Sequence, residues 1–236
     1  MTLDKIIYDV REQLKQYTTD SEVDNRYIIH LFNIKRAKYL RQDLNNFQHT
    51  TDISVTQTIC METEIVSANE CNVPYDCGTI LRTKEKVPTP IELHVKPAIT
   101  AVKPTTRLSV PFNFTTKQKA VYSHFAPYND GIYAFLDNDL HIYMVSTSPE
   151  IKLIECISVT AIFEDPLQTL TFKTCCGCDD PLPCFDIATT NYPLQAHYID
   201  IVKSEVVKEL AIGLSVPEDR ENDSTDDQEQ TEQRKD

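Results

Sequence analysis

Glycine is scarce in this chain, with four among 236 residues. They are Gly78, Gly131, Gly177 and Gly213, and no two lie close enough to form G-x-G-x-x-G or a P-loop, which cradle phosphates on glycine backbone. The G-x-S-x-G elbow and H-E-x-x-H are also absent. These absences exclude most nucleotide-binding enzymes and the common hydrolases. Since no pairing of a nucleophile with a base is visible, we expect that the protein is not an enzyme.

Long hydrophobic runs are missing as well, so we expect no segment that crosses a bilayer and no membrane partner. The opening Met-Thr-Leu-Asp-Lys-Ile-Ile-Tyr carries an early acidic residue and no small-residue cleavage site, which does not fit a secretory signal. Hydrophobic residues make up 41% of the chain and charged residues 25%. This composition predicts a soluble globular protein made in a cytoplasm.

Basic residues are too few to balance the acidic ones, and the formal net charge is −13. Residues 217–236 alone hold nine acidic and three basic residues and no hydrophobic one. Such a tail has nothing to bury, so we expect it to be disordered when alone. The acidity also argues against binding duplex DNA through one broad surface, because neutralising phosphates needs clustered Lys and Arg.

Hydrophobic side chains recur at helical spacing near both ends of the chain. Leu3, Ile6, Val10 and Leu14 predict a first helix with Thr2 as its N-cap, and similar patterns predict helices from about 23 to 44 and from 194 to 214. We expect the first two to form an αα-hairpin and the last to pack against it. The predicted divisions are a helical hairpin at 1–48, a β-rich middle at 49–192, a helix at 193–216 and the acidic tail at 217–236.

The middle of the chain carries strand patterns. Alternating side chains at 132–136, 140–145 and 151–163 predict an antiparallel meander, with a turn at Asp137-Asn138-Asp139 because Asn and Asp tolerate positive φ. Looser alternation predicts strands at 52–66 and 79–82. The expected fold class is therefore α+β: an N-terminal αα-hairpin and a C-terminal helix packed together, an antiparallel β-rich middle and a disordered acidic tail.

Four basic residues stand near the end of the second predicted helix: Lys35, Arg36, Lys38 and Arg41. One interpretation is that they offset the negative end of the helix dipole. The other is that they form a contact patch for an acidic partner surface or for nucleic acid.

Two further groups of residues are candidate sites. Five of the eight cysteines lie in two loops and could supply thiolates to zinc: Cys71, Cys77, Cys175, Cys178 and Cys184. Their spacing is not a clean pair of C-x-x-C motifs, so unligated thiols are favoured and no metal or cofactor is expected. Glu164-Asp165 could be half of a carboxylate pair, but no second acid can be placed opposite it.

Several segments together resemble virion structural proteins of crAss-like phages. They are the opening twelve residues, the run Ile-Ile-His-Leu-Phe-Asn-Ile-Lys-Arg-Ala-Lys-Tyr-Leu-Arg-Gln, Cys-Gly-Thr-Ile-Leu-Arg-Thr at 77–83, residues 157–166, and the Tyr-Pro-Leu-Gln start of the last helix with its acidic tail. The resemblance covers most of the chain. The cysteines at 175–184 are not part of it.

The resemblance implies a neck component of a short-tailed phage: a head-to-tail connector that forms a ring, usually twelve-fold, between portal and tail. It further implies a protein made in the host cytoplasm, with terminal helices that dock on the portal and other neck or tail proteins nearby. DNA would pass through the ring without sequence-specific binding. The alternative is a phage decoration or receptor-contacting module with a zinc-stapled, cysteine-rich loop.

Overall fold

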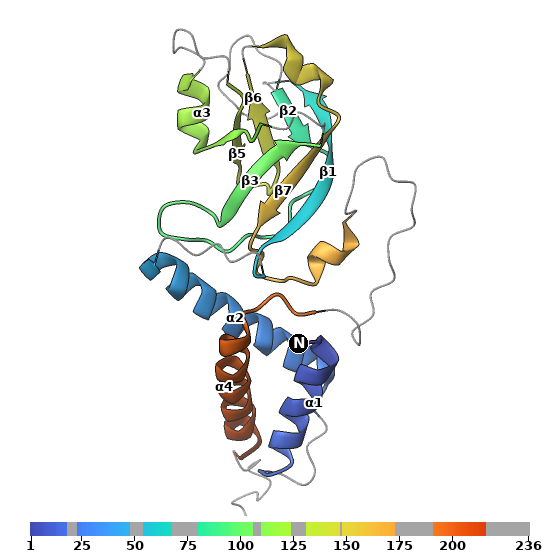
Figure 1. Ribbon diagram of the computed structural model, residues 1–236, viewed down its shortest axis with the longest axis vertical. Helices are drawn as coiled ribbons and strands as arrows, with labels where there is room; N and C mark the ends of the chain where they lie inside the picture. Colours follow the sequence, from blue (N-terminus) through green and yellow to red (C-terminus); the bar gives the residue numbers. More distant parts are fainter. Residues whose placement is uncertain are drawn as a thin grey trace, which may run out of the picture.

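The structure, a computed structural model, describes residues 1–17, 23–47, 54–67, 80–105, 110–123, 131–146, 148–172 and 191–215. Three helices lie at one end of the molecule and a mostly antiparallel sheet of seven strands at the other (Figure 1). This arrangement confirms the α+β class and the packing of helices from the two ends of the chain. The acidic tail at 217–236 lies outside the described residues.

The helices at that end are α1 (Leu3–Leu14), α2 (Asn25–Phe47) and α4 (Ala196–Ser215). An extended Thr2 precedes α1, and the carboxylate of Asp24 caps α2 by accepting from the backbone N–H of Arg26 at 3.1 Å. The apolar faces of all three helices bury one shared cluster, which includes Ile6, Val10, Ile28, Phe32, Val202 and Val206. Within the described residues, no helix has the length and apolar content that a membrane span requires.

Contacts between the first and last helices join the two ends of the chain. The ammonium of Lys203 on α4 lies 3.0 Å from the carboxylate of Asp9 on α1 and 3.0 Å from Asp200. Burial would lower the pKa of Lys203, but its hydrogen bonds to the two carboxylates outweigh burial and raise it. The backbone N–H of Tyr192 also donates to the carbonyl of Met1 at 3.0 Å. These contacts fix α1 against α4.

The sheet has the strand order β3-β7-β1-β2-β6-β5-β4, and only the short β4–β5 pair is parallel. Its strands are β1 (Gln57–Val66), β2 (Ile80–Thr83), β3 (Ile99–Pro104), β4 (Asn113–Phe114), β5 (Tyr133–Leu136), β6 (Ile142–Val145) and β7 (Cys156–Ala161). The strands predicted at 52–66 and 79–82 are present as β1 and β2. One helix, α3 (Lys117–Ser123), packs against β5 beside a second apolar cluster.

The sheet is rolled around its own core because β1 pairs with two different strands along its length. Residues 57–62 of β1 pair with β7, whereas residues 63–66 pair with β2. At the other side, the N–H of Phe112, next to β4, donates to the carbonyl of Val102 on β3 at 2.8 Å. The first and last strands of the order thus meet, and Figure 1 shows β3, β7 and β1 in front of β2, β6 and β5. The result is a nearly closed barrel around the side chains of Ile59, Leu81, Val102, Ile142, Val159 and Phe163.

The predicted meander is wrong in its third strand. Residues 149–153 form a 3-10 helix, η1, because Pro149 starts a helical turn that the hydroxyl of Ser148 caps, accepting from the N–H of Glu150 at 3.3 Å. The apparent alternation of Ile151 and Leu153 was misleading, since the first is buried and the second is 77% exposed. The strand that follows, β7, pairs with β1 and β3 and not with β6.

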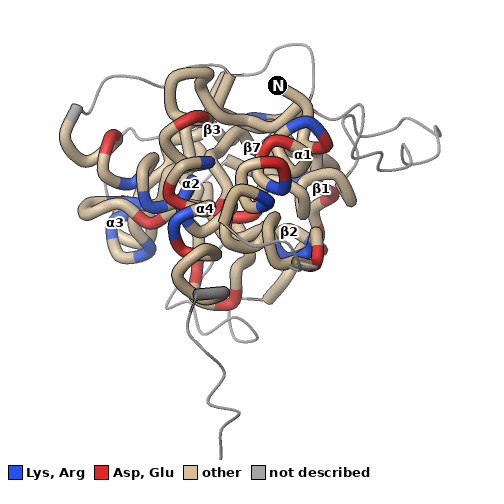
Figure 2. The backbone as a smooth tube through the Cα atoms, turned by 90° about the horizontal axis from the view of Figure 1, so that it is seen from below, with Lys and Arg blue, Asp and Glu red and all other residues tan. Residues whose placement is uncertain are grey.

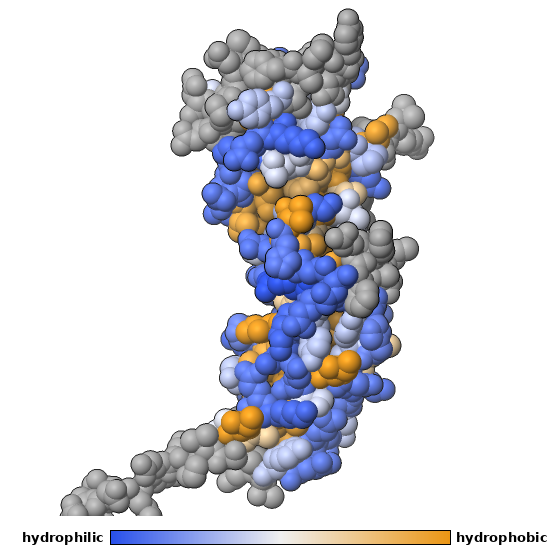
Figure 3. Space-filling view, turned by 90° about the vertical axis from the view of Figure 1, so that its left-hand side faces the viewer, coloured by the Kyte–Doolittle hydropathy of each residue, from blue (hydrophilic) through white to orange (hydrophobic). Residues whose placement is uncertain are grey.

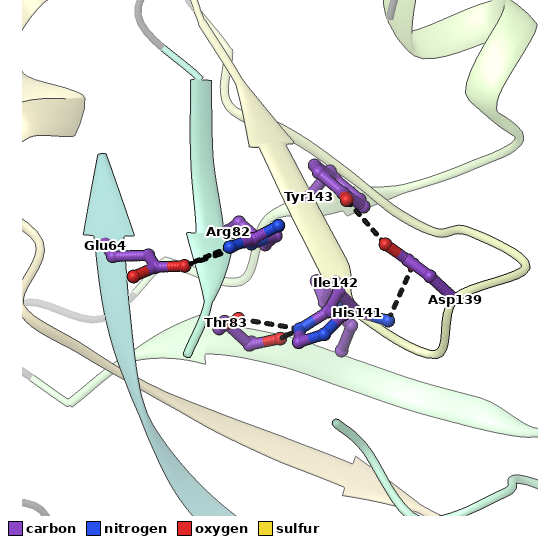
Figure 4. Close-up of polar contacts among 7 residues, drawn as sticks. All are labelled: Glu64, Arg82, Thr83, Asp139, His141, Ile142 and Tyr143. Atoms are coloured by element: carbon purple, nitrogen blue, oxygen red, sulfur yellow. Dashed lines mark hydrogen bonds and ion pairs between the residues drawn. The ribbon is translucent and has the colours of Figure 1, made fainter. Parts of the chain in front are cut away.

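The β5–β6 hairpin is confirmed, but its positive φ falls on an unexpected residue. Leu140 has φ of 64° and occupies the left-handed position where Asn, Asp or Gly is the usual choice. Figure 4 shows how Asp139 holds this turn: its carboxylate accepts from the hydroxyl of Tyr143 at 2.6 Å and from the N–H of His141 at 3.0 Å. The His141 ring in turn contacts the carbonyl of Thr83 at 2.8 Å. Side-chain bonds therefore offset the strain at Leu140.

We predict that acid weakens this hairpin through Asp139. Burial would raise the pKa of Asp139, but the hydrogen bonds from Tyr143 and from the N–H of His141 lower it below its ordinary value. The ionised form is thus favoured in the fold, so its stabilisation is complete above the unfolded pKa and is lost as pH falls through the folded pKa. Because the side chain is exposed, Asp139→Asn should cost only about 0.5–1 kcal/mol at pH 7.

Urea midpoints at pH 7 and below pH 4 check this prediction. The difference between wild type and Asp139→Asn should shrink progressively as the pH falls below 4, because Asp139 becomes protonated first in the unfolded chain and then in the fold. Asn138→Asp provides a control in the same turn. A difference that stays constant with pH would show that the charge of Asp139 contributes nothing.

Candidate interaction site

The four basic residues predicted near the end of α2 do not lie at the end of the helix. They occupy positions 35–41, whereas α2 continues to Phe47 and its last turn contains no basic residue. Helix-dipole effects fall off within the terminal turn. The helix-dipole interpretation is therefore wrong, and the role of each of the four side chains depends on its own contacts.

Lys35 and Lys38 face α4 and pair with its acidic residues. Lys35 forms an ion pair with Glu209, and the ammonium of Lys38 lies 3.7 Å from the carboxylate of Glu205. The hydroxyl of Tyr39 also donates to the carboxylate of Glu205. This hydrogen bond and the charges of Lys38 and Lys35 lower the pKa of Glu205, although burial alone would raise it. Figure 2 views this end of the molecule and shows basic and acidic segments interspersed along α2 and α4.

Arg36 is buried, with an exposed fraction of 0%. Its Nε donates to the carbonyl of Pro193 at 2.9 Å and its Nη1 to the carbonyl of Phe163 at 2.7 Å. The guanidinium carbon lies 5.7 Å from the centre of the Tyr192 ring. Burial lowers the pKa of Arg36. Arg36 therefore links α2 to the segments that contain Phe163 and Pro193. Because its side chain is buried, it is not a candidate for a surface contact.

Arg41 reaches the segment that follows β7. Its Nη2 lies 2.9 Å from the carboxylate of Glu164, and its Nε donates to the carbonyl of Glu92 at 3.2 Å. Lys38 and Arg41 keep about half of their side chains exposed, so either remains accessible to a partner. Of the four predicted residues, these two stay as candidates for partner binding.

Sequence reasoning missed a polar chain beside Arg36. The hydroxyl of Tyr192 donates to Oδ1 of Asn33 at 2.5 Å, and Nδ2 of Asn33 donates to Asp165 at 3.0 Å. Burial raises the pKa of Tyr192, whose ring also meets that of Phe32 edge-on with centroids 5.0 Å apart. Glu164 and Asp165, which the sequence offered as half of a carboxylate pair, thus bind Arg41 and Asn33. The one feature of the sequence that could have indicated these polar contacts is the Phe-Glu-Asp-Pro turn that follows a strand.

A hollow of about 410 Å³ opens where α2 meets this turn. Its lining includes Ile34 and Ala37 of α2 and four charged residues, Lys38, Arg41, Glu164 and Asp165. Ile34 is 48% exposed although its neighbours along the helix are packed. We call this hollow the α2 groove. Its lining combines apolar side chains with charges of both signs, which is the composition of a protein-binding surface.

The five candidate zinc ligands, Cys71, Cys77, Cys175, Cys178 and Cys184, all lie outside the described residues, so the expectation of unligated thiols stays a prediction and zinc stays its alternative. Two other cysteines lie within the described residues: Cys60 on β1, which is buried, and Cys156 on β7, which is partly buried. The described stretches contain no cluster of three or more His, Cys, Asp or Glu side chains that could hold a metal ion.

Comparison with known proteins identifies the family. Residues 5–228 match the model of the family described as phage tail ring protein 2. The chain is also 25% identical over 228 residues to Ring protein 2 of Bacteroides phage crAss001, an alignment that covers 96% of this chain and 98% of the relative. The predicted relationship to crAss-like phage ring proteins is confirmed, and with it a structural role in a virion. With its helical end, rolled sheet and near full-length match, the chain belongs to the phage tail ring protein 2 family.

Proposed function

We propose that the protein forms a homo-oligomeric ring, twelve-fold in symmetry, in the neck of a short-tailed virion. In this proposal the ring is a head-to-tail connector: an adaptor that binds the portal on one side, meets other neck or tail proteins on the other, and continues the DNA channel. The observation that carries the proposal is the near full-length match to a ring protein family, together with an elongated subunit that has a helical end and a barrel end (Figure 1).

The distribution of charge supports passage of DNA without sequence-specific binding. The described residues hold 18 acidic and 18 basic side chains, so the net charge of −13 belongs entirely to the segments between and after them. Most basic residues of α2 are already paired with acidic ones. Such a body offers DNA no concentrated positive charge, and the acidic segments repel it.

We propose the helical end as the portal-facing side. Figure 3 shows a largely hydrophilic surface with small, separate apolar spots over the helices and a larger apolar area over the sheet. Lys38 and Arg41 remain exposed enough to meet acidic groups of a portal. The acidic tail at 217–236 would gain contacts only from a partner and is proposed to order on assembly.

The solution mass of the full chain, alone and mixed with the portal of the same phage, tests this proposal. We expect a complex of ring size with the portal, and about a tenfold weaker complex for Lys38→Glu, because that change reverses a charge at the contact. Lys84→Glu is the matched control, since Lys84 is also half exposed and paired with one carboxylate but lies in the barrel. A chain that ignores the portal, or equal losses in both variants, would contradict the portal contact.

A further inference from the structure

Two hydrophobic side chains near the junction of the helical end and the barrel are not explained by the cores of the protein. Val95 is 87% exposed, the highest value among the large hydrophobic residues described. Leu140 occupies the left-handed backbone region with φ of 64°, where Asn or Gly would be less strained. Neither side chain belongs to, or packs against, the three apolar clusters of the described residues. Residues that break a local rule without a gain in the core are candidates for contact with a partner.

The two side chains line one hollow. It has a volume of about 350 Å³ and lies between the turn at residues 92–97 and the tip of the β5–β6 hairpin. Leu93 and Leu136, both partly buried, also line it. Leu93 packs against the cluster of the helical end and Leu136 against the barrel core, so the hollow lies where the two ends of the molecule meet. We call the hollow and these four side chains the waist patch.

Both walls of the waist patch are held in place. Within the turn at 92–97, the carbonyl of Glu92 accepts from Nε of Arg41 at 3.2 Å, and the N–H of His94 donates to the side chain of Asn45 at 3.2 Å. A backbone bridge closes the base of the turn. On the other wall, the side-chain bonds of Figure 4 hold the hairpin tip. A partner would therefore meet a patch that is already ordered, which lowers the entropy cost of binding.

The position of the waist patch indicates which partner covers it. In Figure 1 the turn is the green loop that precedes β3, and it projects sideways beside the end of α2. If the helical end faces the portal, as proposed above, a surface on the side of the subunit meets neither the portal nor the tail. On that side, an apolar patch that faced the channel or the outside of the ring would stay in water. Only a neighbouring copy would bury it.

We propose that the waist patch is part of the contact between neighbouring copies in the ring, with Val95 and Leu140 buried against the next copy. The inference rests on the proposed ring function and deepens it, because it names a surface through which copies of this chain bind one another. The described body holds equal numbers of acidic and basic residues, so no net charge opposes the approach of two copies.

Photocrosslinking tests the contact in the assembled ring. A benzophenone amino acid replaces Val95 in light-isotope chain, which is mixed with heavy-isotope chain and assembled with the portal. We expect light–heavy crosslinks that join two copies of this chain, and the heavy peptide identifies the facing surface. The same replacement at Leu153, which is 77% exposed in η1, is the control and should give about tenfold less of this product. Crosslinks from position 95 only to the portal, or none between copies, would overturn the contact.

Two substitutions separate assembly from folding. Val95→Glu changes a side chain that is almost fully exposed, and Leu140→Asn places a residue that tolerates positive φ at the strained position. Both variants should keep the Tm of the unassembled chain within about 2 °C of wild type. Both should raise the concentration needed for assembly about tenfold or more, because each removes an apolar side chain from the contact. Leu153→Glu, the matched control, should change neither quantity.

The outcomes distinguish the contact from the ring itself. If the unmodified chain forms no complex of ring size with the portal, the proposed ring falls and the contact with it. If the unmodified chain assembles, and Val95→Glu and Leu140→Asn assemble at the same concentration, the ring stands and the proposed contact is wrong.

Discussion

An Arg36→Ala variant is expected to lose about 3–5 kcal/mol of free energy of unfolding. For a chain of this length that corresponds to a fall in Tm of roughly 6–20 °C. The effect is large because the substitution removes two hydrogen bonds from a buried guanidinium and leaves the carbonyls of Phe163 and Pro193 without those donors. It also removes the packing of Arg36 on the Tyr192 ring.

Lys38→Ala is the matched control for Arg36→Ala, because it removes a basic side chain two positions away on the same helix. Its ion pair with Glu205 is half exposed and spans 3.7 Å, so the expected loss is below about 1 kcal/mol. Thermal unfolding followed by circular dichroism measures both variants. Equal losses would show that Arg36 acts as a surface charge and not as a buried clamp.

A Phe163→Ala variant is expected to lose about 3–5 kcal/mol as well, for a different reason. The Phe163 ring is fully buried in the barrel core, and its removal leaves a cavity. Its backbone carbonyl is at the same time the acceptor for Arg36 of α2. Loss of the Phe163 ring in the barrel should therefore also destabilise the helical end. The unfolding transitions of the helices and of the barrel should then occur at the same lowered temperature.

Leu153→Ala is the control for this cavity, since Leu153 is a large hydrophobic residue of the barrel end that is mostly exposed. It should cost less than about 0.5 kcal/mol. Helix content is followed at 222 nm and the barrel by hydrogen exchange of the backbone amides of its strands. A helical transition that stays at the wild-type temperature in Phe163→Ala would show that the two ends unfold independently.

The sequence was sufficient for the three helices of the helical end and insufficient for α3 and for the sheet. Leu3, Ile6 and Val10 repeat with a period that only one local structure satisfies, so the presence of α1 was predicted. Strand alternation says which face a residue occupies but not which strand lies beside it. The pairing of β7 with β1 depends on contacts between residues about 100 positions apart, and its pairing with β3 on contacts between residues more than 50 positions apart.

The candidate site shows the same limit. A run of basic residues on a helix gives no sign that Arg36 turns inward while Lys38 stays half exposed, because the difference arises from Phe163 and Pro193 in distant segments. The predicted divisions at 1–48, 49–192 and 193–216 stay predictions. Val55, Ile91 and Ile162 from the middle segment share the core of the helical end, so packing is continuous across them.

The contact between α1 and α4 has a consequence for the timing of folding. Lys203 and Asp9 are 194 positions apart, so α1 leaves the ribosome long before α4 is synthesised and can pack against it. At about 5–20 residues per second, synthesis of the intervening chain takes about 10–40 s. During that interval the apolar stripe of Leu3, Ile6 and Val10 has no permanent cover. We therefore expect the nascent chain to expose part of this apolar stripe to chaperones until α4 has been synthesised and completes the shared cluster.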